Sequence, residues 1–494
     1  MKKIIIVGAG ISGLTVGVYA RQSGFDVTIY ESHTIPGGAS TSWRRKGYLF
    51  EGGMHWLTGS SPETAMNKLW RNIGALDDNT SVYNRDPFFT FEYNGQTAHV
   101  YRDAEKLRQH LIGIAPEDEK EINILCKDIK KLTVLDMPIT DIKGVKVKEK
   151  SKMPLSPLFG MLTALPRISF YVNQSSKEYS QRFKNPLLQQ LIQNFAGEEN
   201  NAAAVVFTLA TLSAGDGGYP EGGSLAMARR IADRFEALGG IIKFGTHVNK
   251  VITRDGTAVG VLVNGNEISA DAVIVTQDTR AAIDNLFDTP ICEPWADKMR
   301  REIKPTLNTF ISIGVEADLS DLPESIYFGI DSPLSYGGMN EYIIGINNYA
   351  TYKGYAPDGC TALTSILLGD TYEFWKQCKQ NGTYEDEKQK LAMAFIKILN
   401  EKWPQTKDKI AVWDVATPLT YERYLSSYKG SWMSYLGKGK KMKSYPTKPE
   451  SIKNLYFAGH RLTVPGGLPV AAETGRRAVQ HLCRDTDNVF QGLM

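Results

Sequence analysis

The sequence lacks the features that mark several common classes of protein. It has 5 cysteines in 494 residues, an odd number with no Cys-x-x-Cys pair, which excludes a disulfide framework and favours a reducing, cytosolic environment. No uninterrupted apolar run approaches the ~20 residues that a membrane-spanning helix needs. The net charge is only +3, so electrostatics do not favour a nucleic acid as partner. These absences predict a cytoplasmic globular protein with no nucleic-acid partner.

Motifs for hydrolytic and metal chemistry are missing as well. The chain contains no Gly-x-Ser-x-Gly, no His-Glu-x-x-His and no cysteine cluster, so neither a serine hydrolase nor a metal site is expected. At about 150 residues per domain, the length predicts two or three domains with a substantial core.

What is present begins at the N-terminus. A β-branched run at residues 2–7 leads into GAGISG at 8–13, then a helical stretch at 14–23 and a second strand that ends in Glu31. Gly8 permits a tight turn, Gly10 lets backbone N–H groups approach a pyrophosphate, and Gly13 lets the helix pack on the strand. Glu31 can accept hydrogen bonds from both ribose hydroxyls, which disfavours the 2′-phosphate of NADP. We therefore predict a dinucleotide site that includes Gly8, Ala9, Gly10, Ile11, Ser12, Gly13, Glu31 and Ser32.

A second small-residue loop follows immediately. PGGAS at 36–40 precedes Arg44-Arg45, and GGMHW stands at 52–56. This stretch resembles the extended signature of flavin-dependent amine oxidases, phytoene desaturases and their relatives. The resemblance implies that the dinucleotide is FAD, held by Gly38, Ala39, Ser40, Arg45, Gly53, Met54 and His55.

The chain returns to this pattern twice. Residues 215–276 predict a glycine-rich turn, an amphipathic helix, and hairpins at Asp255-Gly256 and Asn264-Gly265. This order resembles the second FAD segment of the same family and implicates Val248 and Thr276. Residues 454–477 resemble the closing FAD motif of phytoene desaturases, carotenoid isomerases and retinol saturases, which implicates Gly459, His460, Gly467, Leu468 and Val470. Because Cys483 comes late in the final helix, we expect noncovalent FAD.

The interleaving of these segments predicts the fold class. We expect an α/β protein in which a Rossmann-like FAD-binding domain of the glutathione-reductase type, a parallel sheet plus a β-meander, is interleaved with an α+β substrate domain on a mixed sheet. The first domain comprises 1–75, 215–290 and 440–494, and the second comprises 76–214 and 291–439.

An apolar stretch at 155–172 has two interpretations. Pro157, Gly160 and Pro166 should interrupt it, so it is either a core or lid helix or a membrane-contacting entrance for a lipid. The lysine-rich stretch at 143–152 would suit an anionic membrane surface, although such runs are usually solvated faces. The second interpretation would make the protein peripheral on the inner membrane face.

The resemblance implies an FAD-dependent oxidoreductase that desaturates, saturates or isomerises C=C bonds of an apolar, lipid-like substrate such as an isoprenoid, carotenoid or retinoid. Two alternatives stay open: a flavin amine oxidase, and a non-catalytic prenyl-binding escort protein of the same fold. His55 and His460 are the candidates for proton transfer, each with a structural role as its alternative. No second nucleotide motif identifies an electron donor or acceptor.

Overall fold

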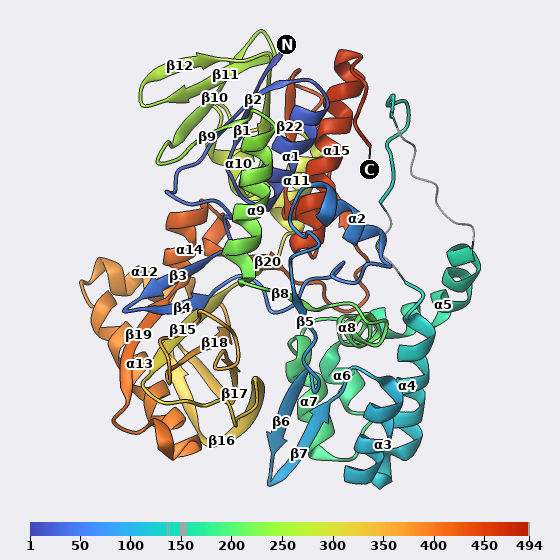
Figure 1. Ribbon diagram of the computed structural model, residues 1–494, viewed down its shortest axis with the longest axis vertical. Helices are drawn as coiled ribbons and strands as arrows, with labels where there is room; N and C mark the ends of the chain where they lie inside the picture. The colour runs from blue at the N-terminus through green and yellow to red at the C-terminus, as the bar shows by residue number, and fades with distance from the viewer. Residues whose placement is uncertain (136, 138, 149–155, 493–494) are drawn as a thin grey trace.

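The computed structural model describes residues 1–135, 137, 139–148 and 156–492, with the backbone alone over 156–163. A five-stranded parallel sheet occupies the top of Figure 1. Its strands, in spatial order, are β22 (Leu455–Phe457), β13 (Ala272–Val275), β1 (Lys3–Val7), β2 (Asp26–Tyr30) and β9 (Ile241–Lys243). All four pairings are parallel, although the strands come from the beginning, the middle and the end of the chain.

Strand β1 is apolar on both faces because both faces of the sheet are covered. Ile4 and Ile6 pack with helices, and Ile5 and Val7 pack with the opposite layer. The helical layer consists of α1 (Ile11–Gln22), α9 (Gly223–Ala237) and α15 (Leu468–Thr486). The opposite layer is the antiparallel meander β10 (Val248–Arg254), β11 (Thr257–Val263) and β12 (Asn266–Ser269).

The meander turns where the sequence predicts. Asp255 and Asn264 have φ of 48° and 50°, and Gly256 and Gly265 have φ of 67° and 78°. Two successive left-handed residues match the right-handed twist of the flanking strands, which is why Asp-Gly and Asn-Gly stand at these positions.

A seven-stranded mixed sheet lies below the parallel one (Figure 1). Its order is β19 (Ile410–Ala416), β15 (Asn308–Val315), β18 (Thr361–Leu368), β17 (Met339–Asn348), β16 (Ser325–Tyr336), β6 (Phe89–Tyr93) and β7 (Gln96–Val100). Only β6 and β16 pair in parallel, and this pair joins the two insertions in one sheet. Helices α12 (Tyr372–Gln380) and α13 (Tyr384–Lys402) pack with this sheet around the fully buried Trp375.

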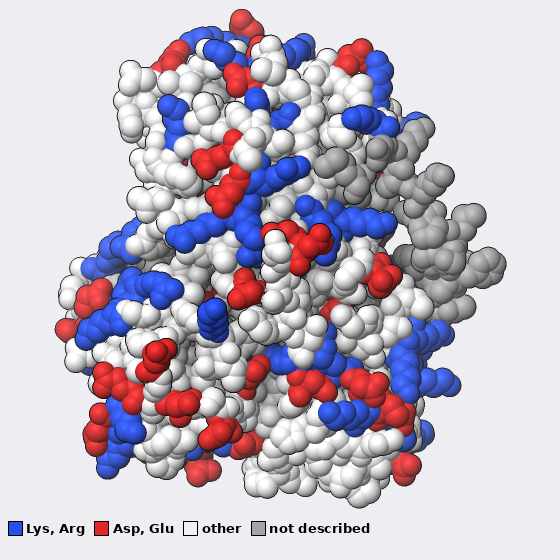
Figure 2. Space-filling model, in the orientation of Figure 1, with Lys and Arg blue, Asp and Glu red and all other residues white. Residues whose placement is uncertain are grey.

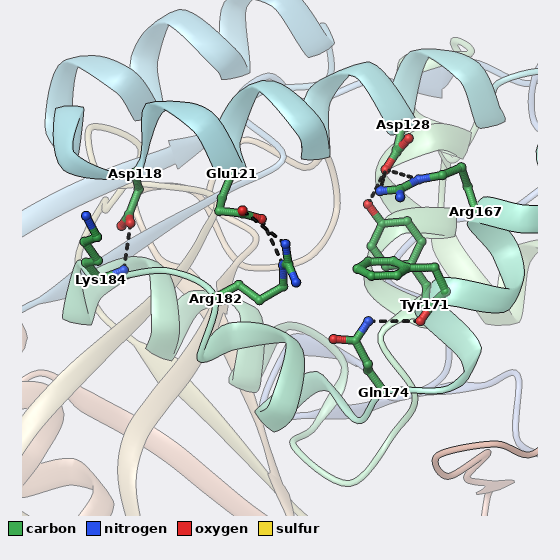
Figure 3. Close-up of polar contacts among 9 residues, drawn as sticks. Asp118, Glu121, Asp128, Arg167, Tyr171, Gln174, Arg182 and Lys184 are labelled. Carbon is green, nitrogen blue, oxygen red and sulfur yellow. Dashed lines mark hydrogen bonds and ion pairs between the residues drawn. The ribbon is translucent and has the colours of Figure 1, made fainter.

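Beside the mixed sheet stands a group of helices, at the lower right of Figure 1. Its members are α3 (Ala104–Ile114), α4 (Glu119–Leu132), α5 (Ser156–Val172), α6 (Ser176–Ser180), α7 (Pro186–Ala196) and α8 (Ala203–Ser213). Acidic residues of α4 hold the neighbouring segments (Figure 3). Asp128 accepts a hydrogen bond from Tyr171 Oη at 2.6 Å and pairs with Arg167, and Glu121 pairs with Arg182 at 2.9 Å. Buried Asp128 thus anchors the end of α5 to the helical core.

Helix α5 differs from expectation. Its backbone is continuous from Ser156 to Val172, with Pro166 inside it, so the predicted interruptions at Pro157, Gly160 and Pro166 are wrong. Pro157 falls in the first turn, where its missing N–H has no partner to lose. Leu155 lies outside the described residues. Over the described ranges, no helix combines the length and apolar character needed to cross a membrane.

Shorter elements complete the fold. The remaining helices are α2 (Ala65–Asn72), α10 (Thr279–Asn285), α11 (Pro294–Glu302) and α14 (Pro418–Leu425). The two-stranded pairs are β3 (Ser42–Arg45) with β4 (Tyr48–Glu51), β5 (Val82–Tyr83) with β8 (Tyr219–Pro220), β14 (Pro305–Thr306) with β20 (Met433–Ser434), and β21 (Lys443–Ser444) with β23 (Thr463–Val464). Lys and Arg are interspersed with Asp and Glu over the face shown in Figure 2. The predicted fold class is confirmed: a parallel sheet with a meander, combined with a mixed sheet.

Candidate functional site

The three glycine-rich segments meet at the carboxyl ends of β1, β13 and β22. The Thr276 N–H donates to the Val7 carbonyl at 3.0 Å, and the Ala458 N–H donates to the Val275 carbonyl at 3.0 Å. The Thr276 side chain also donates to the Val7 carbonyl, at 2.8 Å. Ligands of open α/β sheets bind at this end of the strands, so the fold itself selects this edge.

In the first turn, Gly13 at the start of α1 lies so close to the end of β1 that no side chain fits at this position. A Cβ on Gly13 would lie 1.9 Å from the Gly8 carbonyl oxygen and 2.8 Å from Thr276 Oγ1. Gly8 has φ of 102°, and its N–H donates to the Tyr30 carbonyl at 2.8 Å. Ala9, Ile11 and Ser12 are buried in the same turn. Helix α1 therefore begins directly against the end of β1, with its N-terminal N–H groups at the sheet edge.

The second loop packs on the first. The Gly37 N–H donates to the Ala9 carbonyl at 2.9 Å, and a Cβ on Gly38 would lie 3.2 Å from Gly10 Cα. A Cβ on Gly53 would lie 2.8 Å from the Ala39 carbonyl oxygen and 2.9 Å from Ser40 Cα. The glycines at 38 and 53 thus let three pieces of backbone approach one another, which separate glycine-rich surface loops would not require.

Glu31 stands at the end of β2 and is buried. One carboxylate oxygen accepts the Ala9 N–H at 2.6 Å, and the other accepts the His33 N–H at 2.8 Å and the Ser32 hydroxyl at 3.3 Å. Each carboxylate oxygen has two lone pairs, so one acceptor position, on the oxygen that binds the Ala9 N–H, is left for a ribose hydroxyl. The Thr246 N–H donates to the Glu31 carbonyl at 2.8 Å and brings the segment that leads into Val248 alongside.

Three buried serine hydroxyls fit a polar ligand at this edge. Ser12, Ser40 and Ser224 have no hydrogen-bond partner for Oγ among the described residues. Ser12 lies in the first loop, Ser40 in the second loop, and Ser224 at the start of α9, and a Cβ on Gly53 would touch both Ser40 and Ser224. Buried hydroxyls without partners cost free energy, and a polar ligand bound at this edge would supply partners for them. The residues present therefore fit a dinucleotide.

A cavity of about 340 Å³ lies between the second loop and the second insertion. Of the predicted residues, Glu31, Gly38, Ala39 and Arg45 line it, and the others do not. The opposite wall comes from β19 and α14 and includes Asp414, Thr420, Tyr421 and Tyr424. These four were not predicted, because nothing in the sequence around 414–424 resembles a cofactor motif. Arg45 Nε lies 3.3 Å from Asp414 Oδ2, so this predicted FAD-binding residue is paired with a carboxylate of the second insertion.

Glu51 organises the loop that carries Gly53, Met54 and His55. One oxygen accepts the Gly53 N–H at 2.9 Å and the Met54 N–H at 3.1 Å. The other accepts Tyr219 Oη at 2.9 Å and the Ser224 N–H at 2.9 Å. Glu51 was not among the predicted residues, although its position directly before Gly52-Gly53 could have indicated it.

The closing segment is held by α15. The Gly459 N–H donates to Thr474 Oγ1 at 2.9 Å, and Gly459 has φ of 139°. Gly467, with φ of 104°, is the N-cap of α15, so Leu468 and Val470 stand in the first turn of that helix. The helix contacts α1 closely, because a Cβ on Gly475 would lie 2.8 Å from the Ser12 carbonyl oxygen.

The two candidate histidines are neutral at neutral pH. Burial, together with the smaller effect of the Arg85 charge, lowers the pKa of His55 to about 4. Burial also lowers the pKa of His460 to about 3, helped by Arg461 and opposed by Asp278. The His55 Nδ1 lies 3.5 Å from the Asn347 amide nitrogen, which belongs to the mixed sheet, whereas His460 packs on the turn at Gly466. The His55 ring therefore lies toward the mixed sheet, and the His460 ring lies against the closing turn.

These pKa values predict the pH dependence of stability. A histidine whose folded pKa lies below its unfolded value of about 6.5 stabilises the fold above that pH, and this stability is lost as the pH falls toward the folded pKa. We expect the urea midpoint to fall between about pH 6.5 and pH 4. His55→Gln should make this decline shallower, and substitution of the exposed His247 should not. Equal slopes in His55→Gln and the wild type would contradict the assignment.

Aromatic side chains continue from His55 toward the mixed sheet. The Trp56 ring lies 5.5 Å from Phe88, which lies 6.0 Å from Phe89, and Phe89 lies 5.3 Å from both Tyr327 and Phe195. We call these five residues the aromatic row. Trp56 comes from the cofactor loop, Phe88 directly precedes β6, and the others come from β6, β16 and α7, so the row joins the cofactor loop to the mixed sheet.

A buried ion pair secures the closing segment. Arg461 Nε lies 2.7 Å from Asp278 Oδ2, and the two side chains are 1% and 2% exposed. Arg461 also donates to the Met433 carbonyl at 2.7 Å and to Ser434 Oγ at 2.6 Å. Asp278 caps α10 by accepting the Ala281 N–H at 3.1 Å. The sequence offered no signal for this pair, whose members are 183 positions apart.

Comparison with known proteins agrees with this geometry. The family model described as flavin-containing amine oxidoreductase matches residues 11–483. Prolycopene isomerase 2 of an Oncidium hybrid cultivar is 24% identical over 97% of this chain and 84% of that protein. The 4,4'-diaponeurosporene oxygenase of Staphylococcus aureus (strain Mu50 / ATCC 700699) is 23% identical over 97% of this chain and 98% of that protein. A cofactor-site mutant of putrescine oxidase has a TM-score of 0.64 at 17% identity, over 98% of this chain and 99% of that one.

Site geometry and family agree on the cofactor. The glycine turns and unpartnered serines fit a dinucleotide, and the matching family contains flavin, so the cofactor is FAD. The match covers nearly the whole chain. It begins at residue 11, after the first strand and most of the first glycine turn, and it includes the two later glycine-rich segments in full. The chain therefore belongs to the flavin-containing amine oxidoreductase family.

Proposed function

We propose that this FAD-dependent oxidoreductase desaturates, saturates or isomerises C=C bonds in an apolar, isoprenoid-like substrate. The observation that carries the proposal is the aromatic row, which extends from the cofactor loop at His55 into the mixed sheet. Large aromatic surfaces bind apolar ligands through area burial and ring contacts. Relatives named as a prolycopene isomerase and a diaponeurosporene oxygenase support the same substrate class.

The chain's own residues have distinct roles in this proposal. When bound, FAD supplies hydride transfer at N5. The predicted residues at 8–13, Glu31, Ser32, 38–40, Arg45, 53–55, Val248, Thr276, Gly459, His460, Gly467, Leu468 and Val470 bind the cofactor without a covalent link. The aromatic row orients the substrate and excludes water. His55 stays neutral and can hold a proton at one ring nitrogen and accept one at the other.

The domain division is part of the proposal. Segments 1–75, 215–290 and 440–494 form the cofactor domain, and 76–214 and 291–439 form the substrate domain. This division is supported by the sheets, because every strand of the parallel sheet falls in the first set and every strand of the seven-stranded sheet in the second.

We also propose that the surface around α5 contacts a membrane as the substrate enters. Lys143, Lys146 and Lys148 are exposed, and Leu165 of α5 is 53% exposed. Exposed basic side chains suit an anionic lipid surface, and an exposed apolar side chain suits its interior, although the lysines lie near the C-terminal segment, where Lys146 pairs with Asp487 at 2.7 Å.

Anaerobic spectroscopy of the purified holoenzyme tests the function. Bleaching of oxidised flavin by a polyene would identify desaturation, and reoxidation of photoreduced flavin by a polyene would identify saturation. A polyene product with altered chromatographic retention, formed with no net change in the redox state of the flavin, would identify isomerisation. We expect one of these three results for polyenes delivered in anionic vesicles, and weaker activity with zwitterionic vesicles, to which the enzyme should bind less.

Two results would contradict the proposal. Bleaching by amines but by no polyene would indicate an amine oxidase. A colourless protein that binds no FAD would indicate a non-catalytic lipid-binding role.

A further inference from the structure

Arg85 places a positive charge in the aromatic row. Its guanidinium carbon lies 4.8 Å from the centre of the Phe88 ring, and the side chain is half-buried. The Phe88 ring contacts Trp56, the residue directly after His55. A cation therefore lies within an otherwise apolar surface, near the loop that carries His55.

The charge of Arg85 acts on groups from three parts of the chain. It adds to the burial that lowers the pKa of His55. It opposes the burial that raises the pKa of Tyr327, on β16, and that of Tyr352, which follows β17. Arg85 is thus surrounded by ring-bearing residues of the cofactor loop and the mixed sheet, and does not point away from them into solvent.

The Arg85 side chain interacts with the Tyr352 hydroxyl, which in turn donates to Glu324, but the guanidinium has no direct carboxylate partner in the described part of the chain. Among the residues that the structure describes, Arg85 has no ion pair within 4.0 Å. Its chain neighbour Asp86 pairs with Lys106 at 3.1 Å and accepts the Arg102 N–H at 2.9 Å. Glu324 accepts from Tyr352 Oη at 3.1 Å and from Thr351 Oγ1 at 2.9 Å. Asp86 is therefore paired with another cation, and Glu324 reaches Arg85 only through the Tyr352 hydroxyl.

Of the two neighbouring arginines, Arg85 and Arg102, only Arg85 lacks a directly balancing carboxylate within the described ranges. Arg102, the next arginine, donates to the carbonyl oxygens of Asp216 and Gly217, and the carboxylates of Asp86 and Asp216 balance its charge. A carboxylate ligand would give this half-buried arginine the direct counter-ion that it lacks. Its planar fork matches a carboxylate in a bidentate manner, whereas a diphosphate would require more than one cation.

We propose that Arg85 binds the carboxylate end group of an otherwise apolar, unsaturated substrate. This inference rests on the proposed function and narrows its substrate class from any polyene to a polyene carboxylic acid. The aromatic row binds the chain of that acid, and Arg85 sets which end of the chain lies toward His55. Arg85 is therefore a specificity-determining residue.

A matched pair of ligands tests the proposal by equilibrium dialysis with the holoenzyme. Retinoic acid and retinol share one polyene and differ in the end group. We expect the wild-type protein to bind the acid more tightly. Arg85→Gln should weaken binding of the acid by about tenfold to a hundredfold, the loss expected for a charge-assisted hydrogen bond, and change binding of the alcohol by less than about twofold.

Two further variants sharpen the result. Arg85→Lys keeps the charge without the fork, and should retain part of the preference for the acid. Arg254→Gln removes an exposed, ion-paired arginine of β10 and should change neither affinity. FAD content and the urea midpoint of each variant show whether it is folded.

The outcomes separate this inference from the proposed function. Wild-type protein that binds and converts retinol but shows no preference for the acid would overturn the role of Arg85 alone. The same role would be overturned if Arg85→Gln lowered the affinities for the acid and the alcohol equally, or if the wild-type protein bound retinyl phosphate more tightly than retinoic acid. If the protein bound neither retinoid and no other polyene, both proposals would be overturned.

Discussion

Gly13→Ala is expected to abolish retention of FAD during purification and to lower the unfolding free energy by about 1–3 kcal/mol, the cost of an overpacked site. The new Cβ would lie 1.9 Å from the Gly8 carbonyl oxygen, which no side-chain rotation relieves because both atoms are fixed by backbone. Helix α1 must move away from β1, and the N–H groups at its start would leave the edge of the sheet. Visible flavin absorbance and urea denaturation measure the two effects.

Gly113→Ala is the matched control for this substitution. Gly113 also lies inside a helix, α3, but a Cβ there would meet no atom within 4 Å. Alanine at an unobstructed helical position stabilises by about 0.5–1 kcal/mol. Flavin content should therefore stay at the wild-type level in Gly113→Ala. Full flavin content in Gly13→Ala would show that the close contact between turn and helix is not required.

Arg461→Met is expected to lower the unfolding free energy by about 3–5 kcal/mol, the range for removing one partner of a buried ion pair. Methionine fills much of the arginine's volume, but it leaves the Asp278 carboxylate buried without a counter-ion. It also leaves the Met433 carbonyl and Ser434 hydroxyl without a donor. The shift of the urea midpoint at saturating FAD measures the loss.

A double substitution separates the charge from the shape of this pair. Asp278→Asn removes the buried charge and keeps an oxygen that can cap α10, so Arg461→Met combined with Asp278→Asn should be more stable than Arg461→Met alone. Arg254→Met removes a pair whose side chains are 62% and 57% exposed, and should change stability by less than about 1 kcal/mol. Equal losses at Arg461 and Arg254 would contradict the importance of burial.

Local parts of the fold follow from local sequence. The strand, turn, helix and strand of residues 3–30 were predictable because each depends on neighbours within a few positions: a β-branched run, glycines at 8, 10 and 13, and an acid at 31. The meander was predictable for the same reason, since Asp-Gly and Asn-Gly fix their own turns. The continuous helix α5 was not, because a proline inside an apolar stretch is ambiguous without knowledge of what packs beside it.

Residues of the site divide in the same way. The glycines and Glu31 were found from spacing, whereas Glu51, Asp414, Arg461 and Arg85 were not. Glu51 is recognisable only through its bonds to Tyr219 and Ser224, which are 168 and 173 positions away. Asp414 lies beside Arg45 because the second insertion folds back over the cofactor loop.

The sequence by itself determined that the chain carries a dinucleotide-binding turn, two further glycine-rich segments and a discontinuous α/β architecture. It could do so because turns, caps and strand patterns are encoded by residues close in the chain. Only the tertiary structure decided which acids hold the cofactor loops, which aromatic rings continue from His55, and that Arg85 forms no direct ion pair among the described residues. Those properties depend on burial and on contacts between distant segments, and a side chain's charge acquires a role only once its surroundings are assembled.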